Sequence, residues 1–246
     1  MSKIIVITGA GIGLGRALAR RFANDGDRVV LLGRTFSKVQ AAAQEIGDRA
    51  MAIECDVASP SSVKAAFAAI AERYPRIDVL INNAAVFEPF LVAEATDEQI
   101  MSTITTNLAG AIFCARSAIP LMGRGSHIIN VSSESVEETH LPHLILYQCS
   151  KAGLERFTLG LHRELQPTGI RVSTVRAGSM KEEGKVWNID PAARMRFGKA
   201  AMEAGINLLT RPLSQFTSVT HVFRSLIDLP DDLHSVTVTL HARRPE

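Results

Sequence analysis

Hydrophobic and polar positions follow two different periods along the chain. Short apolar runs lie at 3–8, 29–32, 50–55, 77–81, 127–132 and 170–175, with a last run at 235–240. Such runs predict strands, and the first of them does not alternate, which indicates that it is buried on both faces. Between the runs lie longer stretches whose apolar residues recur every three or four positions, which predicts helices. These stretches are 14–26, 37–46, 62–74, 97–122, 147–166 and 215–228.

The order of these segments predicts the fold class. Strand and helix alternate, which indicates an α/β protein with a parallel sheet and helices on both of its faces. Right-handed crossovers then give a doubly wound, Rossmann-type sheet, in which binding residues lie at the carboxyl ends of the strands. The sequence contains neither an internal repeat nor a linker-like segment, so residues 1–246 are expected to form a single domain. The pattern weakens at about 180–213, which we interpret as a variable substrate lid.

Composition and charge exclude several classes of protein. Hydrophobic residues make up 46% of the chain and charged residues 21%, a balance that excludes a disordered chain. The net charge of +2 indicates neither a nucleic-acid partner nor an anionic membrane surface. No apolar run approaches the roughly 20 residues that span a bilayer, and the first residues do not resemble a signal peptide. Three cysteines without a CxxC pair suit a reducing compartment, so we expect a soluble, cytoplasmic protein.

A glycine-rich loop joins the first predicted strand to the first helix. It has the form Gly-x-x-x-Gly-x-Gly after a threonine. Glycines at such a turn let a diphosphate approach the backbone, and the helix N-terminus favours negative charge. A tight turn that uses glycine only for steric reasons is the alternative, which the position of the loop makes weaker. The residues expected to bind a dinucleotide here are Thr8, Gly9, Gly11, Ile12, Gly13 and Gly15.

The end of the second strand indicates which dinucleotide is bound. NAD-specific Rossmann folds place an acidic residue there, about 20 residues after the glycines, to bind the ribose hydroxyls. This sequence has Gly33 and then Arg34. An arginine pairs well with a 2′-phosphate, so NADP(H) is favoured over NAD(H). The alternative is that Arg34 is a solvated loop charge.

Tyr147 and Lys151 lie four positions apart on a predicted helix, which places a phenol and an ammonium group on one face. Acid–base chemistry near neutral pH requires that the phenol pKa of about 10 be lowered, and a neighbouring cation has this effect. The pair alone is common by chance. Its significance comes from further motifs in the same chain, which are the glycine loop, Asp56-Val57, Asn82-Asn83-Ala84, Asn107 and Ser132-Ser133.

In their order and spacing these motifs resemble those of the short-chain dehydrogenase/reductase superfamily, from about residue 3 to residue 176. The resemblance implies an oxidoreductase that interconverts a carbonyl and a secondary alcohol by hydride transfer. It implies that Tyr147 is the general acid/base and that Lys151 binds the nicotinamide ribose and lowers the pKa of the tyrosine. Ser133 would hydrogen-bond the substrate oxygen, with Ser132 as the alternative. Asn107 would hold a water that links the lysine to solvent.

The resemblance also implies further cofactor contacts and an oligomer. Asp56 and Val57 match positions that contact adenine, and Asn82 matches the residue that stabilises the central strands. Relatives pair the helices that correspond to 97–122 and 147–166, so a homodimer or homotetramer is expected. The expected cofactor contacts outside the glycine loop are Arg34, Asp56, Val57, Asn83, Ala84, Tyr147, Lys151 and Gly178.

The sequence departs from the family pattern after the sixth strand. Ala177-Gly178 replaces the Pro-Gly of the family. Lys181-Glu182 stands where a family threonine touches the nicotinamide carboxamide, and Ser179 is the candidate replacement. These departures bear on how the nicotinamide is held.

Candidate substrate contacts lie beside the catalytic residues. Glu134 directly follows the serine pair, His143 lies in the loop before the catalytic tyrosine, and Trp187 lies in the predicted lid. Each has a plainer alternative as a surface or core residue. No metal site is expected, because hydride transfer already has its electrophile. Cys149 is expected to be a buried, unreactive thiol.

Two other functions remain open at this point. A catalytically silent dinucleotide-binding regulator would be expected to lack at least one of the four catalytic positions, and the sequence has them all. An epimerase or dehydratase would use the same tyrosine and would form product without a net change in the cofactor. The substrate is defined only as a small carbonyl or alcohol compound.

Overall fold

The computed structural model describes residues 2–137, 142–181 and 190–243. Seven parallel strands form one sheet in the order β3-β2-β1-β4-β5-β6-β9. The predicted doubly wound α/β fold is therefore confirmed, and the strand order reverses between β1 and β4, where such sheets bind ligands. The strands are β1 (Ile4–Thr8), β2 (Arg28–Gly33), β3 (Ala50–Glu54), β4 (Val79–Asn82), β5 (His127–Ser133), β6 (Arg171–Ala177) and β9 (Thr237–Thr239).

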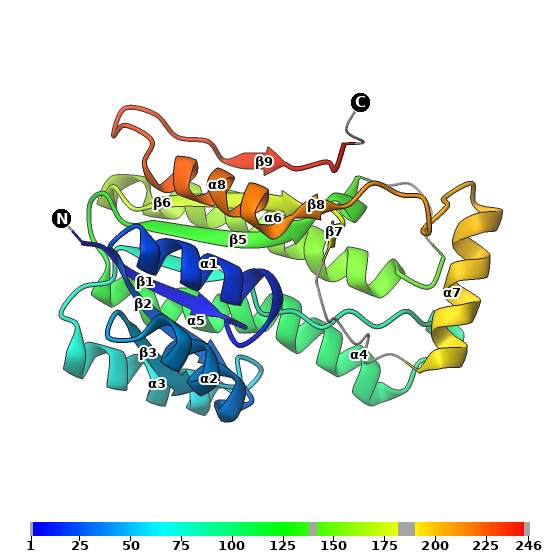
Figure 1. Ribbon diagram of the computed structural model, residues 1–246, viewed down its shortest axis with the longest axis horizontal. Coiled ribbons are helices and arrows are strands. Elements are labelled where there is room, and N and C mark those ends of the chain that lie inside the picture. Colours follow the sequence, from blue (N-terminus) through cyan, green and yellow to red (C-terminus); the bar gives the residue numbers. More distant parts are fainter. Residues whose placement is uncertain (1, 138–141, 182–189, 244–246) are drawn as a thin grey trace.

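Helices cover both faces of the sheet (Figure 1). One face carries α1 (Gly13–Asn24), α2 (Phe36–Ile46) and α8 (Phe216–Ile227). The other face carries α3 (Pro60–Arg73), α5 (Gly110–Ala118) and α6 (Ile145–Leu165), and α4 (Asp97–Ile104) packs on α6. Among the helices that the structure describes, none is both long and apolar enough to cross a membrane.

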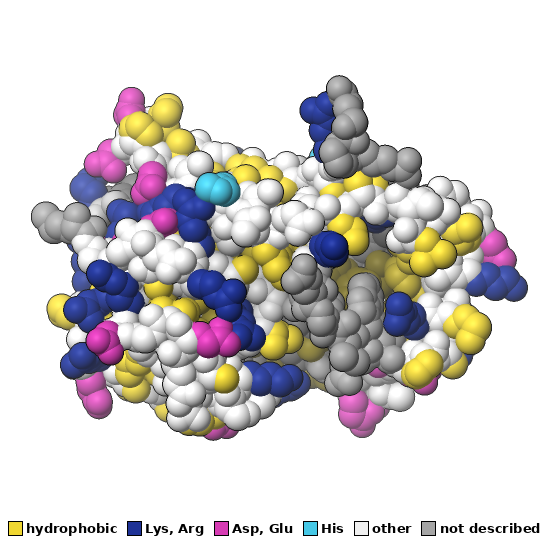
Figure 2. Space-filling model, viewed as in Figure 1, with side chains coloured by type: hydrophobic (Ala, Val, Ile, Leu, Met, Phe, Trp, Pro, Cys, Tyr) yellow, Lys and Arg dark blue, Asp and Glu magenta, His cyan; other side chains and the backbone are white. Residues whose placement is uncertain are grey.

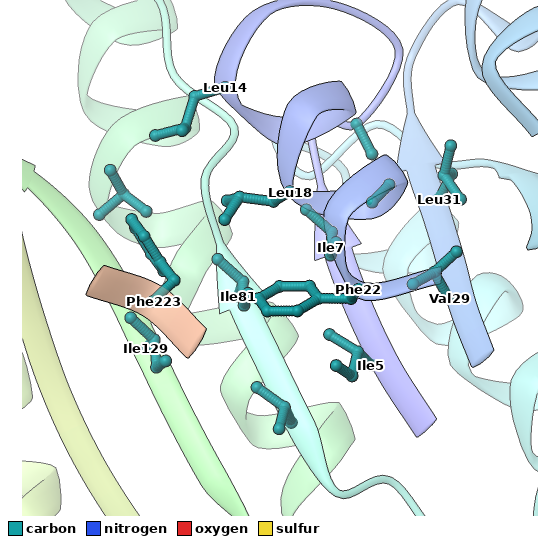
Figure 3. Close-up of a cluster of buried hydrophobic side chains, with 14 of the residues drawn as sticks. Ile5, Ile7, Leu14, Leu18, Phe22, Val29, Leu31, Ile81, Ile129 and Phe223 are labelled. Carbon is teal, nitrogen blue, oxygen red and sulfur yellow. The ribbon is translucent and has the colours of Figure 1, made fainter. Parts of the chain in front are cut away.

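The side chains between α1, α8 and the sheet form one of the two large cores. Phe22 of α1 and Phe223 of α8 are fully buried against Ile5, Ile81 and Ile129 of the central strands (Figure 3). A second core fills the space between the opposite face and α3, α5 and α6. Because the sheet is covered on both faces, β1 and β4 are apolar at every position except the last residue of each strand, which explains the uninterrupted apolar runs in the sequence.

The predicted helical region 97–122 is not one continuous α-helix. Between α4 and α5 the chain forms a π-helical turn at Thr105–Ala109, and α5 ends in a 3₁₀ turn at Ile119–Leu121. The amide of Asn107 lies inside the π-helical turn and bonds to the backbone of Val86. Such turns often occur at functional sites, where the extra residue redirects a side chain.

The predicted lid segment 180–213 is ordered in its described parts. A two-stranded parallel ribbon pairs β7 (Met180–Lys181) with β8 (Ser214–Gln215), and α7 (Pro191–Glu203) lies at the end of the sheet toward which the strands run (Figure 1). The side chain of Asp190 caps α7 by accepting a hydrogen bond from the backbone of Ala193. The segment thus stands over the carboxyl ends of the strands, and its role as a lid stays a prediction.

Candidate active site

A pocket of about 730 Å³ lies at the carboxyl ends of the strands. Its volume is in the range of small-molecule and cofactor sites. Among the predicted site residues that the structure describes, those outside the pocket wall are Thr8, Gly15, Asn107 and His143. The predicted residues that do line it are Gly9, Gly11, Ile12, Gly13, Arg34, Asp56, Val57, Asn83, Ala84, Ser133, Glu134, Tyr147, Lys151 and Gly178.

The glycine loop has the geometry of a diphosphate cradle. Gly9 and Gly13 have φ values of 64° and 58°, which side chains rarely adopt. A Cβ on Gly15 would lie 2.5 Å from the carbonyl oxygen of Gly9, so α1 packs closely on the loop only because Gly15 has no side chain. The residue before α1 is Ile12, which has no acceptor to cap the first N–H groups of the helix. A helix N-terminus of this kind, open to the pocket at Gly13, fits the diphosphate of a dinucleotide.

Thr8 and Asn83 hold the loop in place. The Thr8 hydroxyl accepts hydrogen bonds from the backbone N–H groups of Asn83 and Ala84, both over 3.0 Å. The Asn83 amide donates to the carbonyl oxygens of Thr8 and Gly9 over 3.0 and 3.3 Å. Thr8 is buried, and its hydroxyl joins the end of β1 to the segment after β4. Thr8 therefore supports the glycine loop from behind and does not line the pocket itself.

Two cations lie where the second strand meets its helix. Arg34 follows β2, and Lys38 lies four positions later near the start of α2. Both side chains are exposed and line the pocket. Lys38 was not among the residues predicted from the sequence; a second cation within a few residues of Arg34, just after the second strand, was the available signal.

The hydroxyl groups of Ser133 and Tyr147 meet in the pocket. Ser133 ends β5, and Tyr147 lies in the first turn of α6. Burial raises the pKa of the Tyr147 phenol above its ordinary value, and its hydrogen bond with Ser133 acts in the opposite direction. Ser133 also accepts hydrogen bonds from the backbone N–H and the hydroxyl of Ser135, over 3.2 and 2.9 Å. Two hydroxyl groups are thus available to one substrate oxygen.

Lys151 lies one turn after the tyrosine on α6 and is 2% exposed. Its Nζ donates to the carbonyl oxygen of Val131 over 2.8 Å and lies 5.9 Å from the centre of the Tyr147 ring. Burial lowers the pKa of the ammonium group to about 8. The expected lowering of the tyrosine pKa is not seen in the protein alone, because burial has the larger effect on the phenol.

Asn107 connects the π-helical turn to the catalytic helix. Its Nδ2 donates to the Ser150 hydroxyl over 3.1 Å, and that hydroxyl donates to the carbonyl oxygen of Tyr147 over 2.7 Å. Its Oδ1 accepts from the backbone N–H of Val86 over 2.8 Å. The side chain is therefore engaged with the protein, and its role in a proton relay stays a prediction.

The two serines at the end of β5 have different partners. The hydroxyl of Ser132 donates to Glu155 over 2.7 Å, and Glu155 forms an ion pair with Arg176 at 2.7 Å. Ser133 instead acts on the phenol of Tyr147, whose pKa it tends to lower. The geometry therefore favours Ser133, rather than the alternative Ser132, as the serine that meets the substrate.

Glu134 lies in the pocket wall beside Ser133 and is 6% exposed. Its carboxylate accepts from the backbone N–H of Ser179 over 3.0 Å and from the guanidinium of Arg211 over 2.7 Å. It also lies 3.1 Å from Nδ1 of His241. Arg211 and His241 could not be predicted as partners of Glu134, because they lie 77 and 107 positions further along the chain.

His143 is not part of the pocket wall. His143 is half-buried with a φ of 67°, and its carbonyl oxygen accepts from the backbone N–H of Phe90. Trp187 lies outside the described residues. Within residues 2–137, 142–181 and 190–243, no group of three His, Cys, Asp or Glu side chains is placed to hold a metal ion. Cys149 is exposed, so the expectation of a buried thiol is wrong: it points away from the face of α6 that carries Tyr147 and Lys151 into the protein.

The parallel sheet, the glycine cradle and the pocket define the class as a Rossmann-type dinucleotide-binding protein. A family model for short chain dehydrogenases matches residues 3–188. The chain belongs to the short-chain dehydrogenase/reductase family. It is an oxidoreductase of that family, with a pocket for a nicotinamide dinucleotide.

Individual relatives agree with this assignment. The NADP-dependent 3-hydroxy acid dehydrogenase of Salmonella typhi is 33% identical over 181 residues, which cover 71% of this chain and 71% of that protein. A short chain dehydrogenase from Burkholderia cenocepacia J2315, in complex with NADP, has a TM-score of 0.82 at 27% identity, covering 97% of this chain and 96% of its own. The 3-ketoacyl-(acyl-carrier-protein) reductase from Brucella melitensis, complexed with NADH, has a TM-score of 0.79 at 25% identity, with coverage of 97% and 96%.

Proposed function

We propose that this protein is an NADP(H)-dependent oxidoreductase that interconverts a carbonyl and a secondary alcohol, with Tyr147 as general acid and base. The observation that carries the proposal is that Ser133 and Tyr147 line the same pocket as the glycine loop and that the Ser133 side chain acts on the Tyr147 phenol, whose pKa it tends to lower. Two hydroxyl donors on one oxygen would stabilise the negative charge that develops there during reduction.

Each catalytic side chain has a distinct task in this proposal. NADPH, when bound, supplies the hydride for reduction. Ser133 and Tyr147 donate hydrogen bonds to the carbonyl oxygen, and Tyr147 then gives its proton to that oxygen. The ammonium of Lys151 stabilises the phenolate that remains, and in alcohol oxidation the phenolate takes the proton back. Glu134 is proposed to shape the wall beside the substrate.

The preference for NADP(H) rests on Arg34 and Lys38, which are exposed and both line the pocket. A 2′-phosphate between them would meet two positive charges, whereas the ribose hydroxyls of NAD(H) would meet no acidic residue at the end of β2. Similar solved structures are complexed with NADP or NADPH in several cases and with NADH in another, so the preference has to come from this chain's own residues.

The test measures turnover of a panel of ketones with NADPH. The loss of absorbance of the reduced nicotinamide reports the rate. Tyr147→Phe removes the proton donor and keeps the ring, so we expect turnover to fall at least about a thousandfold while NADPH affinity changes less than about twofold. Tyr74→Phe is the matched control, because Tyr74 lies buried in the second core and outside the pocket wall.

The outcomes separate the proposal from its alternatives. Retention of more than about a tenth of the activity by Tyr147→Phe would contradict the assigned role. A catalytically silent regulator would bind NADPH and reduce no ketone. An epimerase or dehydratase would release product while the absorbance of the cofactor stays constant.

A further inference from the structure

The end of the pocket beside Tyr147 has an apolar wall formed by Phe87, Leu144, Phe197 and Leu208. The ring of Phe87 lies edge-to-face on the ring of Tyr147, with centroids 5.1 Å apart and planes at 79°. The ring of Phe197 lies edge-to-face on Phe87 at 6.3 Å and 74°. Apolar side chains are visible inside the hollow beside α7 (Figure 2).

The apolar wall combines two separate parts of the chain. Leu144 precedes α6 directly and Phe87 follows β4, so these two belong to the frame that also positions Tyr147. Phe197 belongs to α7, and Leu208 follows that helix. The predicted lid segment therefore places apolar side chains, one of them aromatic, against the group that holds the substrate oxygen.

The charged side chains described at this end of the pocket already have partners within the protein. Arg211 and Glu134 form an ion pair at 2.7 Å, with side chains that are 22% and 7% exposed. The Lys151 ammonium donates to a backbone carbonyl oxygen. A carboxylate on the substrate would have to leave water for a wall that offers mainly hydrocarbon, and that transfer is costly unless a new charge partner is supplied.

We propose that the substrate carries a bulky apolar group, of the size of an aromatic ring, on one side of its carbonyl or alcohol carbon, and that this group binds the apolar wall. The inference rests on the proposed function, since it uses the oxygen position at Ser133 and Tyr147. Aryl rings suit the wall because edge-to-face contacts with Phe87 and Phe197 add to the gain from burial. Short anionic ketones and hydroxy acids are poor substrates in this account, although a relative is a 3-hydroxy acid dehydrogenase.

The test compares three methyl ketones that share the reacting carbonyl and its first two carbons. Benzylacetone ends in a phenyl ring, levulinate ends in a carboxylate at the same position, and butanone has a hydrogen there. We expect kcat/KM with NADPH to be at least about tenfold higher for benzylacetone than for either of the others, because an apolar group of this size has such an effect in a hydrophobic pocket.

Substitutions in α7 test whether Phe197 is responsible for the preference for benzylacetone. Phe197→Ala should lower kcat/KM for benzylacetone about tenfold, mainly through KM, and leave the value for butanone within about twofold. Phe197→Leu should restore part of the loss, because it returns apolar volume without the ring. Met195→Ala is the matched control, since Met195 lies on the same helix and is 72% exposed. Circular dichroism verifies that each variant is folded.

Binding of benzylacetone to the NADPH complex, measured by calorimetry, distinguishes this inference from the proposed function. Binding that depends on Phe197 without any turnover would support the apolar wall and overturn the proposed function. Turnover with equal kcat/KM for the three ketones, or with preference for levulinate, would overturn the inference and leave the proposed function standing. Loss of both ketone activities in Phe197→Ala would indicate a structural role for the ring and would also overturn it.

Discussion

At the scale of single residues, burial has opposite effects on the two central groups of the pocket. It raises the pKa of the Tyr147 phenol and lowers the pKa of the Lys151 ammonium to about 8, because burial disfavours the charged form of each. The protein alone therefore holds the phenol protonated, the state that reduction requires. Alcohol oxidation requires the phenolate, which the positive charge of an oxidised nicotinamide would favour. The oxidation state of the cofactor and the direction of catalysis are thus both linked to the proton on the Tyr147 phenol.

Arg34 provides the sharpest test of cofactor choice. Arg34→Ala should weaken NADPH binding about 10- to 100-fold, because a charge-assisted pair with the 2′-phosphate is lost, and should change NADH binding less than about twofold. Dissociation constants from fluorescence titration of each cofactor measure this. Arg49→Ala is the control: Arg49 bonds to the carbonyl oxygen of Gly26 and lies outside the pocket wall. Equal weakening of NADPH and NADH binding would show that Arg34 does not bind the 2′-phosphate.

At the scale of helices and strands, close packing rather than chemistry determines several glycine positions. A Cβ on Gly15 would lie 2.5 Å from the Gly9 carbonyl oxygen and 2.6 Å from the Asn83 amide nitrogen, so α1 would have to move away from the cradle. A Cβ on Gly160 of α6, in contrast, would have no neighbouring atom within 4 Å. The two helices therefore respond to the same added methyl group in opposite ways.

Gly15→Ala should destabilise the protein by about 1–3 kcal/mol through overpacking and should weaken cofactor binding as the cradle shifts. Gly160→Ala should stabilise it by about 0.5–1 kcal/mol, because alanine favours the helix and meets no neighbour. Urea unfolding of both variants beside the unchanged protein measures the two effects. A Gly15→Ala protein with unchanged stability and cofactor affinity would contradict the packing argument.

The same scale shows what the sequence could and could not predict. The strands and the cradle were predictable, because doubly buried strands have continuous apolar runs and a strand-to-helix turn around a diphosphate needs glycine. The π-helical turn was not, because it depends on a contact between Asn107 and Val86 that only the folded chain brings together. The pairing of Glu134 with Arg211 spans 77 positions, and its partner lies in the segment where the family pattern fades.

At the scale of the whole molecule, three histidines lie at the end of the sheet opposite the pocket. His127 begins β5 and is 1% exposed, with Nε2 placed 2.8 Å from the Ser173 hydroxyl. His234 lies 6.0 Å from its ring and stacks on His162 at 4.6 Å. Burial, together with the positive charge of Arg171 and the neighbouring His234, keeps the pKa of His127 well below its ordinary value. Burial also lowers the pKa of His234.

Because of these pKa shifts, we expect the free energy of unfolding to decrease as the pH falls. In the unfolded chain a histidine binds a proton below about pH 6.5, whereas folded His127 stays neutral well below that pH. The unfolded state therefore binds more protons as pH falls, so the contribution is complete above about pH 6.5 and is lost progressively below it. For His127 the loss amounts to about 1.4 kcal/mol per pH unit until its folded pKa is reached.

Replacement of His127 tests this account. In urea unfolding at pH 7.5, 6.5 and 5.5, His127→Gln should flatten the decline in unfolding free energy below pH 6.5 by about 1.4 kcal/mol per unit, since glutamine has no proton to bind. His221→Gln is the control, because His221 lies on the exposed side of α8. The comparison is between slopes, so a general loss of stability in either variant does not affect it. Identical slopes for His127→Gln and the unchanged protein would mean that the acid response arises from other groups, among them His234 and the carboxylates.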